Sequence, residues 1–216
     1  MAYGSQASVP PEVPDVARIL RANRLALARL MAVRLLIAGL LVAVPVTISR
    51  MTGVNSFFLV LPIPVGVGVC ILTVYRALHG TRVSRCARVL RTYPLEFHPR
   101  VLKKYERWTE YGNVFAVRVT TRGQHGAPLM VAVNADGRRR WPEEVEESGG
   151  WLAGDLPFGG VLVVPGSNAM LFLKPADWDK TARKREEAGA ERLAIAQRAK
   201  LTRRTKYAGA RRSRAL

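Results

Sequence analysis

Two long apolar stretches dominate the first third of the chain. The first covers residues 30–49, and the second, residues 54–75, contains no charged residue. A helix needs about twenty apolar residues to cross the hydrocarbon of a bilayer. The first stretch includes Arg34 near its start, and a long side chain near a helix end can reach the headgroups. The pattern therefore predicts two membrane-spanning helices.

A short, turn-rich connection joins the two predicted spans, so we expect antiparallel neighbouring helices. Arginines crowd the outer flanks of the pair, whereas the connection, residues 50–55, carries Arg50 alone. Because positively charged flanks stay in the cytoplasm, the sequence predicts a multi-pass protein of the cell membrane with both termini cytoplasmic. A cleaved signal peptide is the alternative for the first stretch. The leader is long and arginine-rich, however, and no small-x-small cleavage site precedes Arg50.

Prolines and glycines interrupt the second predicted span at Pro62, Pro64, Gly66 and Gly68. A broken helix of this kind can line a transport site, whereas small residues also let two helices approach closely. No Asp, Glu, Lys or His lies inside either span to hold a proton or an ion. Close packing is therefore the favoured interpretation.

Arginines recur on both sides of the predicted hairpin. Between residues 82 and 91 they stand at every third position, a spacing shared with voltage-sensing helices. Two spans cannot build a sensor bundle, so we expect membrane-hugging basic helices on both sides. The residues predicted to contact anionic lipid or another polyanion are Arg18, Arg21, Arg24, Arg34, Arg76, Arg82, Arg85, Arg88, Arg203, Arg204, Arg211 and Arg212.

The hydrophobic period changes after Arg91 and becomes typical of strands. Residues 114–120 alternate with period two, and residues 129–133 continue after a Gly-containing turn. Further strands are predicted at residues 139–141, 151–153, 161–164 and 170–173. Five or six short strands in about eighty residues predict a small barrel of the SH3-like or OB type, or a compact sandwich.

The last part of the chain is predicted to be a basic helix, beginning near Trp178, followed by a disordered tail. The expected organisation has four regions. They are a disordered N-terminus (1–14), a basic helix with the hairpin and a juxtamembrane helix (15–91), a small cytosolic β domain (92–176), and the basic helix with its tail (177–216).

The formal net charge of +18 over 216 residues indicates a polyanionic neighbour. From Lys180 to the C-terminus there are thirteen Lys and Arg against three Glu. Beside a bilayer, anionic lipid is the favoured partner of this segment. Nucleic acid is the second alternative, since phosphate neutralisation needs no sequence code. The third alternative is a solvated tail whose only role is to fix the orientation of the chain in the membrane.

No catalytic or metal-binding motif is present. His79, His98 and His125 lie far apart without partners at ligand spacing, so they are expected at the surface. The acidic run at residues 143–147 is expected to be a solvated loop, and the tryptophans are expected to pack in the core or at the edge of the domain. Cys70 and Cys86 form no disulfide framework. The sequence predicts no enzyme, no cofactor and no metal.

One segment carries a resemblance to known proteins. Residues Gly150 to Gly166, GWLAGDLPFGGVLVVPG, are similar to a segment of uncharacterised two-span integral membrane proteins of high-GC Gram-positive, actinobacterial bacteria. The resemblance covers the chain from Leu30 to Pro175. It implies the same layout, an apolar hairpin followed by a small β domain, and implies no activity.

These observations favour a non-enzymatic, membrane-anchored protein whose cytosolic β domain binds a protein partner or a second copy, or helps an assembly. Two alternatives stay open. The chain could be a subunit of a membrane transport or channel complex, with the Pro- and Gly-containing span at its centre. It could also be a membrane-tethered nucleic-acid-binding protein that acts through its basic tail.

Overall fold

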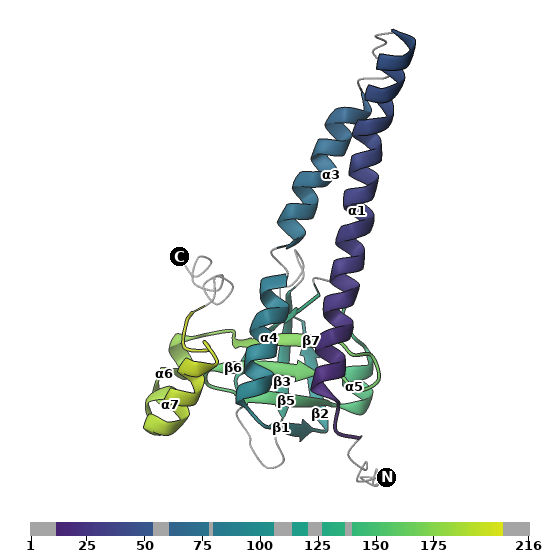
Figure 1. The fold of residues 1–216 in the computed structure, drawn as a ribbon. Helices are drawn as coiled ribbons and strands as arrows, with labels where there is room; N and C mark the ends of the chain where they lie inside the picture. Colours follow the sequence, from purple (N-terminus) through teal and green to yellow (C-terminus); the bar gives the residue numbers. More distant parts are fainter. Residues whose placement is uncertain are drawn as a thin grey trace.

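The structure is a computed structural model that describes residues 12–53, 61–77, 80–105, 114–120, 127–136 and 140–204, with the backbone alone for 75–77. A helical rod rises from a small domain built on one sheet (Figure 1). The helices are α1 (Val16–Thr52), α3 (Pro62–Ala77), α4 (Gly80–Thr92), α5 (Glu144–Ser148), η2 (Asp179–Thr181), α6 (Ala182–Glu186) and α7 (Gly189–Arg198). The strands are β1 (Leu95–His98), β2 (Arg100–Lys104), β3 (Val114–Thr120), β4 (Leu129–Asn134), β5 (Gly150–Asp155), β6 (Gly159–Val163) and β7 (Met170–Pro175).

Helix α1 is unbroken through both the basic segment and the first predicted span. The carboxylate of Asp15 caps its first turn by accepting hydrogen bonds from the N–H groups of Ala17 and Arg18 at 2.9 and 3.1 Å. The helix ends at Gly53, whose φ of 67° suits a glycine at this position. Its 37 residues extend about 55 Å, which exceeds the thickness of the bilayer hydrocarbon.

The upper part of α1 is apolar and uncovered. Within the described residues α1 is the one helix long and apolar enough to cross a membrane, and 11% of its most apolar window is buried. Leu36 and Leu40 are 66% and 54% exposed. A core helix of a soluble protein would be buried instead. The helix is therefore compatible with a membrane anchor, as the sequence predicts for the first span.

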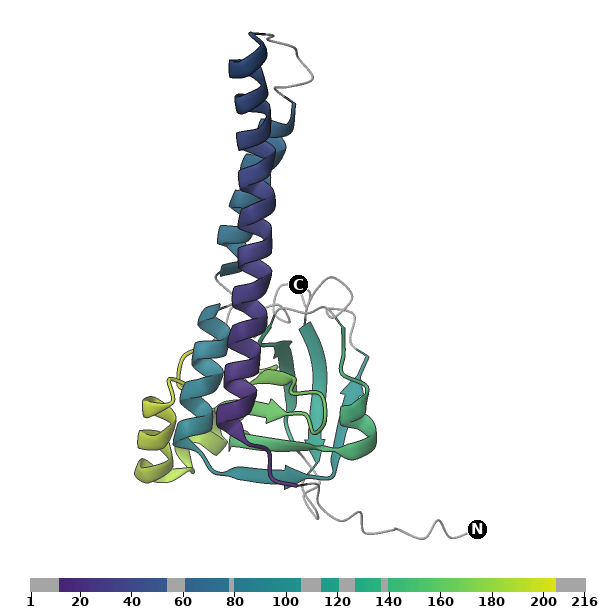
Figure 2. The ribbon, with the colours of Figure 1, turned by 45° about the vertical axis from the view of Figure 1, so that its right-hand side comes forward.

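Helix α3 lies alongside α1 in both views (Figures 1 and 2). The two helices meet closely at Gly66, where a Cβ atom would lie 3.0 Å from Val42 Cγ2 and 3.1 Å from the Ala38 carbonyl oxygen. Gly68 faces open space. Close packing is thus observed at Gly66. Residues 54–60 of the second predicted span lie outside the described residues, and α3 alone, at 16 residues, is shorter than a full span.

The seven described strands form one antiparallel sheet in the order β1-β5-β6-β7-β4-β3-β2. The two edge strands, β1 and β2, are consecutive in the chain and are separated by Pro99 alone. The sheet therefore curls until its edges approach one another, and it forms a half-barrel. This agrees with the barrel-like alternative, since a sandwich would place the strands in two sheets.

Most predicted strands are confirmed to within two residues, with two exceptions. The strand predicted at 139–141 is wrong, because Arg140 forms a bend and Trp141 is not in a strand. The Trp141 ring instead packs against Phe115, with centroids 5.2 Å apart. Strands β1 and β2 were not predicted individually. Only Val101 of the five β2 residues is buried, so the period-two signal is weak there.

The inner, concave face of the half-barrel carries one hydrophobic core. Met130, Leu162 and Leu171 are almost inaccessible, and the Trp141 side chain and α5 close the open side. The acidic run predicted as a loop forms α5. Its glutamates are exposed, whereas Val145 is fully buried in the core. The short helix therefore serves as a lid over the interior.

The outer face of the sheet carries a second core that joins distant parts of the chain. Ile19 and Leu20 come from α1, and α4 contributes Val83, Cys86, Ala87, Val89 and Leu90. Ala196, Ala199 and Leu201 come from the C-terminal segment. The apolar face of α4 therefore lies on the sheet rather than on lipid, contrary to the membrane-hugging expectation. Figure 2 shows α4 and the lower end of α1 side by side over this face.

Candidate functional site

A polar cleft opens where the C-terminal helices meet one edge of the sheet. Its volume is about 760 Å³. Strand β1 supplies Glu96 and His98, the preceding turn supplies Tyr93, and β5 ends in the cleft at Asp155. The side opposite the strands is formed by Lys184, Glu187 and Arg192 of the C-terminal helices. Sequence segments nearly one hundred residues apart thus converge on this cleft.

An ion pair fixes one wall of the cleft. The Arg192 guanidinium donates to both oxygens of the Asp155 carboxylate, with Nε–Oδ2 and Nη2–Oδ1 distances of 3.0 and 2.6 Å. The Asp155 side chain is 11% exposed, and the Arg192 side chain is 54% exposed. The fork geometry of arginine matches a carboxylate in this way. The pair ties α7 to the turn between β5 and β6.

Two buried polar groups in the cleft lack well-formed hydrogen bonds to the part of the chain that the structure describes. His98 is 4% exposed, and neither ring nitrogen has a partner with good geometry among the described residues. The Tyr93 hydroxyl is also buried without a partner there. An unsatisfied buried polar group typically costs about 1–3 kcal/mol, so such groups indicate a place for a ligand or water. The expectation that His98 lies at the surface is wrong, while His79 and His125 lie outside the described residues.

Burial favours the uncharged forms of the His98 ring and the Tyr93 hydroxyl. It lowers the pKa of His98, an effect that outweighs the opposing influences of Glu96 and the Thr120 backbone. Burial, and then the nearby Asp155 carboxylate, raise the pKa of Tyr93 to about 12. At neutral pH a neutral imidazole offers one donor and one acceptor, and the phenol offers the same. The cleft can therefore hold a polar group that both donates and accepts.

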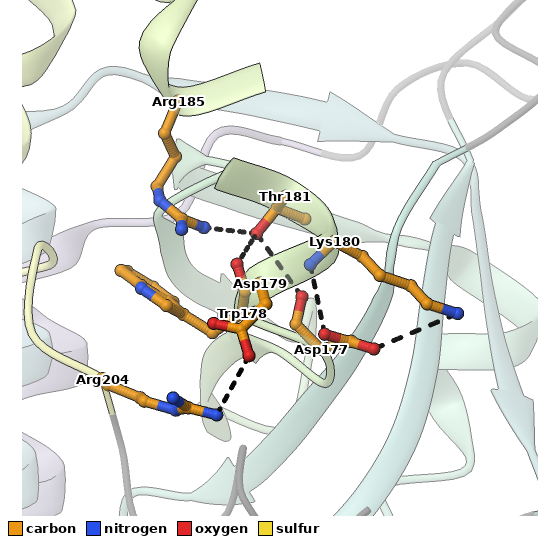
Figure 3. A network of polar contacts seen from close by, with 7 residues as sticks. All are labelled: Asp177, Trp178, Asp179, Lys180, Thr181, Arg185 and Arg204. Carbon is orange, nitrogen blue, oxygen red and sulfur yellow. Dashed lines mark hydrogen bonds and ion pairs between the residues drawn. The ribbon is translucent and has the colours of Figure 1, made fainter. Parts of the chain in front are cut away.

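A second polar network ties the C-terminal segment together (Figure 3). The Thr181 hydroxyl donates to the Trp178 carbonyl at 3.0 Å and accepts from Arg185, whose guanidinium lies 3.9 Å from the Trp178 ring centre. Arg204 pairs with Asp179 at 3.4 Å. Arg204, predicted to lie in a disordered tail, is thus held against the start of this segment.

Lys174 fastens this segment to the sheet. It is 3% exposed, and its Nζ donates to the Phe158 carbonyl at 3.0 Å and to the Leu201 carbonyl. The Trp178 ring lies 4.9 Å away. Burial, with the positive charge of Arg185 and Arg85, lowers the pKa of Lys174 to about 7. A neutral amine still carries two N–H donors, enough for both carbonyls.

The stability of the domain is expected to rise with pH because of Lys174. Its pKa is about 7 in the folded chain against an ordinary 10.5, so the unfolded chain binds more protons above pH 7. The free energy of unfolding should then increase by up to about 1.4 kcal/mol per pH unit. Lys174→Met should lose this slope when denaturant unfolding is measured from pH 7 to pH 9.

The pH range of this measurement must end near 9, because the buried Cys86 thiol has the opposite effect on the free energy of unfolding. Burial raises its pKa from 9.0 to about 12, so the folded chain retains a proton that the unfolded chain loses. This contribution lowers stability as pH rises beyond 9. Equal slopes for the native chain and Lys174→Met below pH 9 would contradict the assignment to Lys174.

The predicted polyanion-contacting arginines do not form one site. Arg18, Arg21 and Arg24 are exposed on the part of α1 that packs on the sheet, Arg34 is half-buried higher on α1, and α4 carries Arg82, Arg85 and Arg88. Arg203 and Arg204 are exposed at the C-terminal end of the described chain. The Arg76 side chain, Arg211 and Arg212 lie outside the described part.

Sequence reasoning missed the residues that the structure brings together, chiefly Tyr93, Lys174 and Arg192. Lys174 gave one signal, as a lone charge at the end of the apolar run Met170–Leu173. Within the described ranges no group of three His, Cys, Asp or Glu side chains could hold a metal ion. Comparison with protein-family models, curated proteins and solved structures gave no match for this chain.

Proposed function

We propose that this chain is a membrane-anchored, non-enzymatic binding protein. A hairpin of two spans holds the half-barrel domain at the cytoplasmic face, and the cleft between β1, β5 and α7 binds a segment of a protein partner. The observation that carries this proposal is the continuity of α1. The same helix contributes Ile19 and Leu20 to the domain core and Leu36 and Leu40 to an exposed apolar rod.

The start of α4 and the part of α1 just before the first predicted span lie at the same height on the domain. This supports two spans rather than one. A Cβ atom at Gly80 would lie 3.4 Å from the Leu27 side chain, so the start of α4 and this part of α1 are in contact. The first predicted span begins three residues later, at Leu30. Both segments therefore leave the domain together, as expected for a hairpin with both ends on one side.

The chemistry of the cleft favours a peptide segment as the ligand. Asp155 is neutralised by Arg192, and Glu187 pairs with Arg183 at 2.7 Å. Among the described residues of the cleft, the His98 ring and the Tyr93 hydroxyl have no hydrogen-bond partner of good geometry. A backbone amide presents one donor and one acceptor, which matches these two groups. Leu152, Leu156 and Pro157 provide apolar contacts beside them.

A photo-crosslinking experiment tests the binding proposal in cells that express the full chain. A photoreactive residue at Glu96, on the cleft, should yield one defined crosslinked protein. The same residue at Arg198, exposed on α7 and not part of the cleft lining, serves as the control. The crosslink at position 96 should disappear with His98→Ala. Identical patterns from both positions, or a pattern unchanged by His98→Ala, would count against a ligand in the cleft.

A further inference from the structure

Two rows of arginine run side by side on the outer surface of the domain. Helices α1 and α4 cover the same face of the sheet (Figure 2) and turn their apolar residues toward it. The remaining sides of the two helices carry the arginines, and Arg85 is close enough to the buried Lys174 to lower its pKa. We name this surface the arginine ridge, and it consists of Arg18, Arg21 and Arg24 on α1 and Arg85, Arg88 and Arg91 on α4.

The two rows overlap in height. Helices rise about 1.5 Å per residue, so the α1 row lies about 5–14 Å below the contact between Leu27 and Gly80. The α4 row, counted from Gly80, lies about 8–17 Å below the same contact. Packed helix axes are about 8–10 Å apart. The six arginines therefore lie along about 12 Å of two neighbouring helices.

Within the described residues no carboxylate neutralises the ridge. Neither α1 nor α4 contains Asp or Glu, and none of the six arginines forms an ion pair with a described residue. The acid next to the ridge in sequence, Asp15, is engaged in capping α1. Five of the six side chains are exposed, and Arg88 is partly buried. Such a density of like charge is self-repulsive unless a polyanion covers it.

The bilayer is poorly placed to be that polyanion. This step rests on the proposed anchor, in which the first span begins near Leu30. Arg24 then lies about 9 Å and Arg18 about 18 Å from the hydrocarbon along the axis of α1. The headgroup layer is only about 5–8 Å thick, and the surface potential decays over a Debye length of about 8–10 Å. The lower half of the ridge therefore stands beyond the headgroups.

We propose that the arginine ridge binds the phosphate backbone of a nucleic acid on the cytoplasmic side of the membrane. A duplex carries one negative charge per about 1.7 Å of its axis, or about five over the length of one row. Guanidinium groups match phosphate in a bidentate fashion. No aromatic residue belongs to the ridge, so base stacking plays no part. The contact is to the backbone and independent of sequence.

Binding of a short DNA duplex to the full chain in phosphatidylcholine nanodiscs tests the proposal. The triple variant R85Q/R88Q/R91Q should bind about tenfold more weakly at low salt, with a salt dependence reduced by about two to three phosphate contacts. R18Q/R21Q/R24Q, whose side chains are all exposed, should behave alike. The control R100Q/K104Q/R118Q removes equal charge from exposed positions on β2 and β3 and should change binding much less.

Three outcomes would overturn the proposal. Equal weakening by the ridge variants and the control would mean that net charge alone attracts the duplex. If phosphatidylglycerol in the nanodisc abolishes the difference between the native chain and the ridge variants, the ridge belongs to lipid. If an acidic peptide competes with the duplex at equal charge concentration, the partner is an acidic protein. The same binding measurements are repeated in detergent micelles, where no bilayer is present. Ridge variants that bind as well as the native chain there count against the ridge, whereas a difference seen only in micelles counts against the proposed membrane anchor.

Discussion

Replacing Leu201 with alanine is expected to lower the free energy of unfolding of the domain by about 2–5 kcal/mol. Leu201 lies beyond the last helix, yet its side chain is fully buried in the outer core with Ala196 and Ala199. Truncation to alanine removes this contact and leaves a cavity. Chemical denaturation of the full chain in micelles, monitored by tryptophan fluorescence, measures the change in the free energy of unfolding.

Leu193→Ala is the matched control for this prediction. Leu193 lies on α7 and is 38% exposed, so the same substitution should cost less than about 1 kcal/mol. A similar loss for both variants would mean that the C-terminal segment is an appendage rather than part of the core. The sequence places residue 201 in a separate basic region, which makes the comparison informative.

Replacing Gly66 with leucine is expected to separate α3 from α1. A Cβ atom there would come within 3.1 Å of the Ala38 carbonyl oxygen and 3.2 Å of Leu41 Cβ, so a larger side chain cannot be accommodated. Overpacking of this kind typically costs about 1–3 kcal/mol. Unfolding of the full chain by sodium dodecyl sulfate in mixed micelles measures the loss.

Gly68→Leu provides the control two residues along the same helix. Nothing lies within 4 Å of a Cβ atom at Gly68, so leucine there should change stability by less than about 0.5 kcal/mol. A larger loss for Gly68→Leu than for Gly66→Leu would contradict the observed packing of the two helices. It would also remove one support for the proposed hairpin.

The parts of the fold that the sequence predicts well depend on local pattern. Phe115, Val117 and Val119 recur with period two because all three belong to the inner core, and α1 is apolar over many turns. Strands β1 and β2 lack such a pattern because they are the edge strands of the sheet, and each buries a single residue, His98 in β1 and Val101 in β2. Trp141 misled the prediction because its burial comes from a loop that folds over the half-barrel, not from a strand.

The candidate site could not be predicted because its environment is created by tertiary contacts. Nothing near His98 in sequence indicates that Gly149 and Gly150 pack against its backbone at the end of β1. The buried position of Lys174 likewise depends on a carbonyl 27 residues away, at Leu201. For α4, two of the regularly spaced arginines, Arg85 and Arg91, are exposed, whereas Arg82 and Arg88 are partly buried. The apolar face opposite could meet either lipid or a sheet, and the pattern alone does not distinguish the two.

The central claim, a hairpin that crosses the membrane and keeps the domain in the cytoplasm, is tested most directly by cysteine labelling. Met51 is 83% exposed at the far end of α1, and Glu191 is exposed on α7. Each is replaced by cysteine in a Cys70→Ala chain, in which the remaining Cys86 is fully buried. A membrane-impermeant maleimide should label Met51→Cys in intact cells and Glu191→Cys only after the membrane is opened. Protection of both positions, or equal labelling of both, in intact cells would contradict the account.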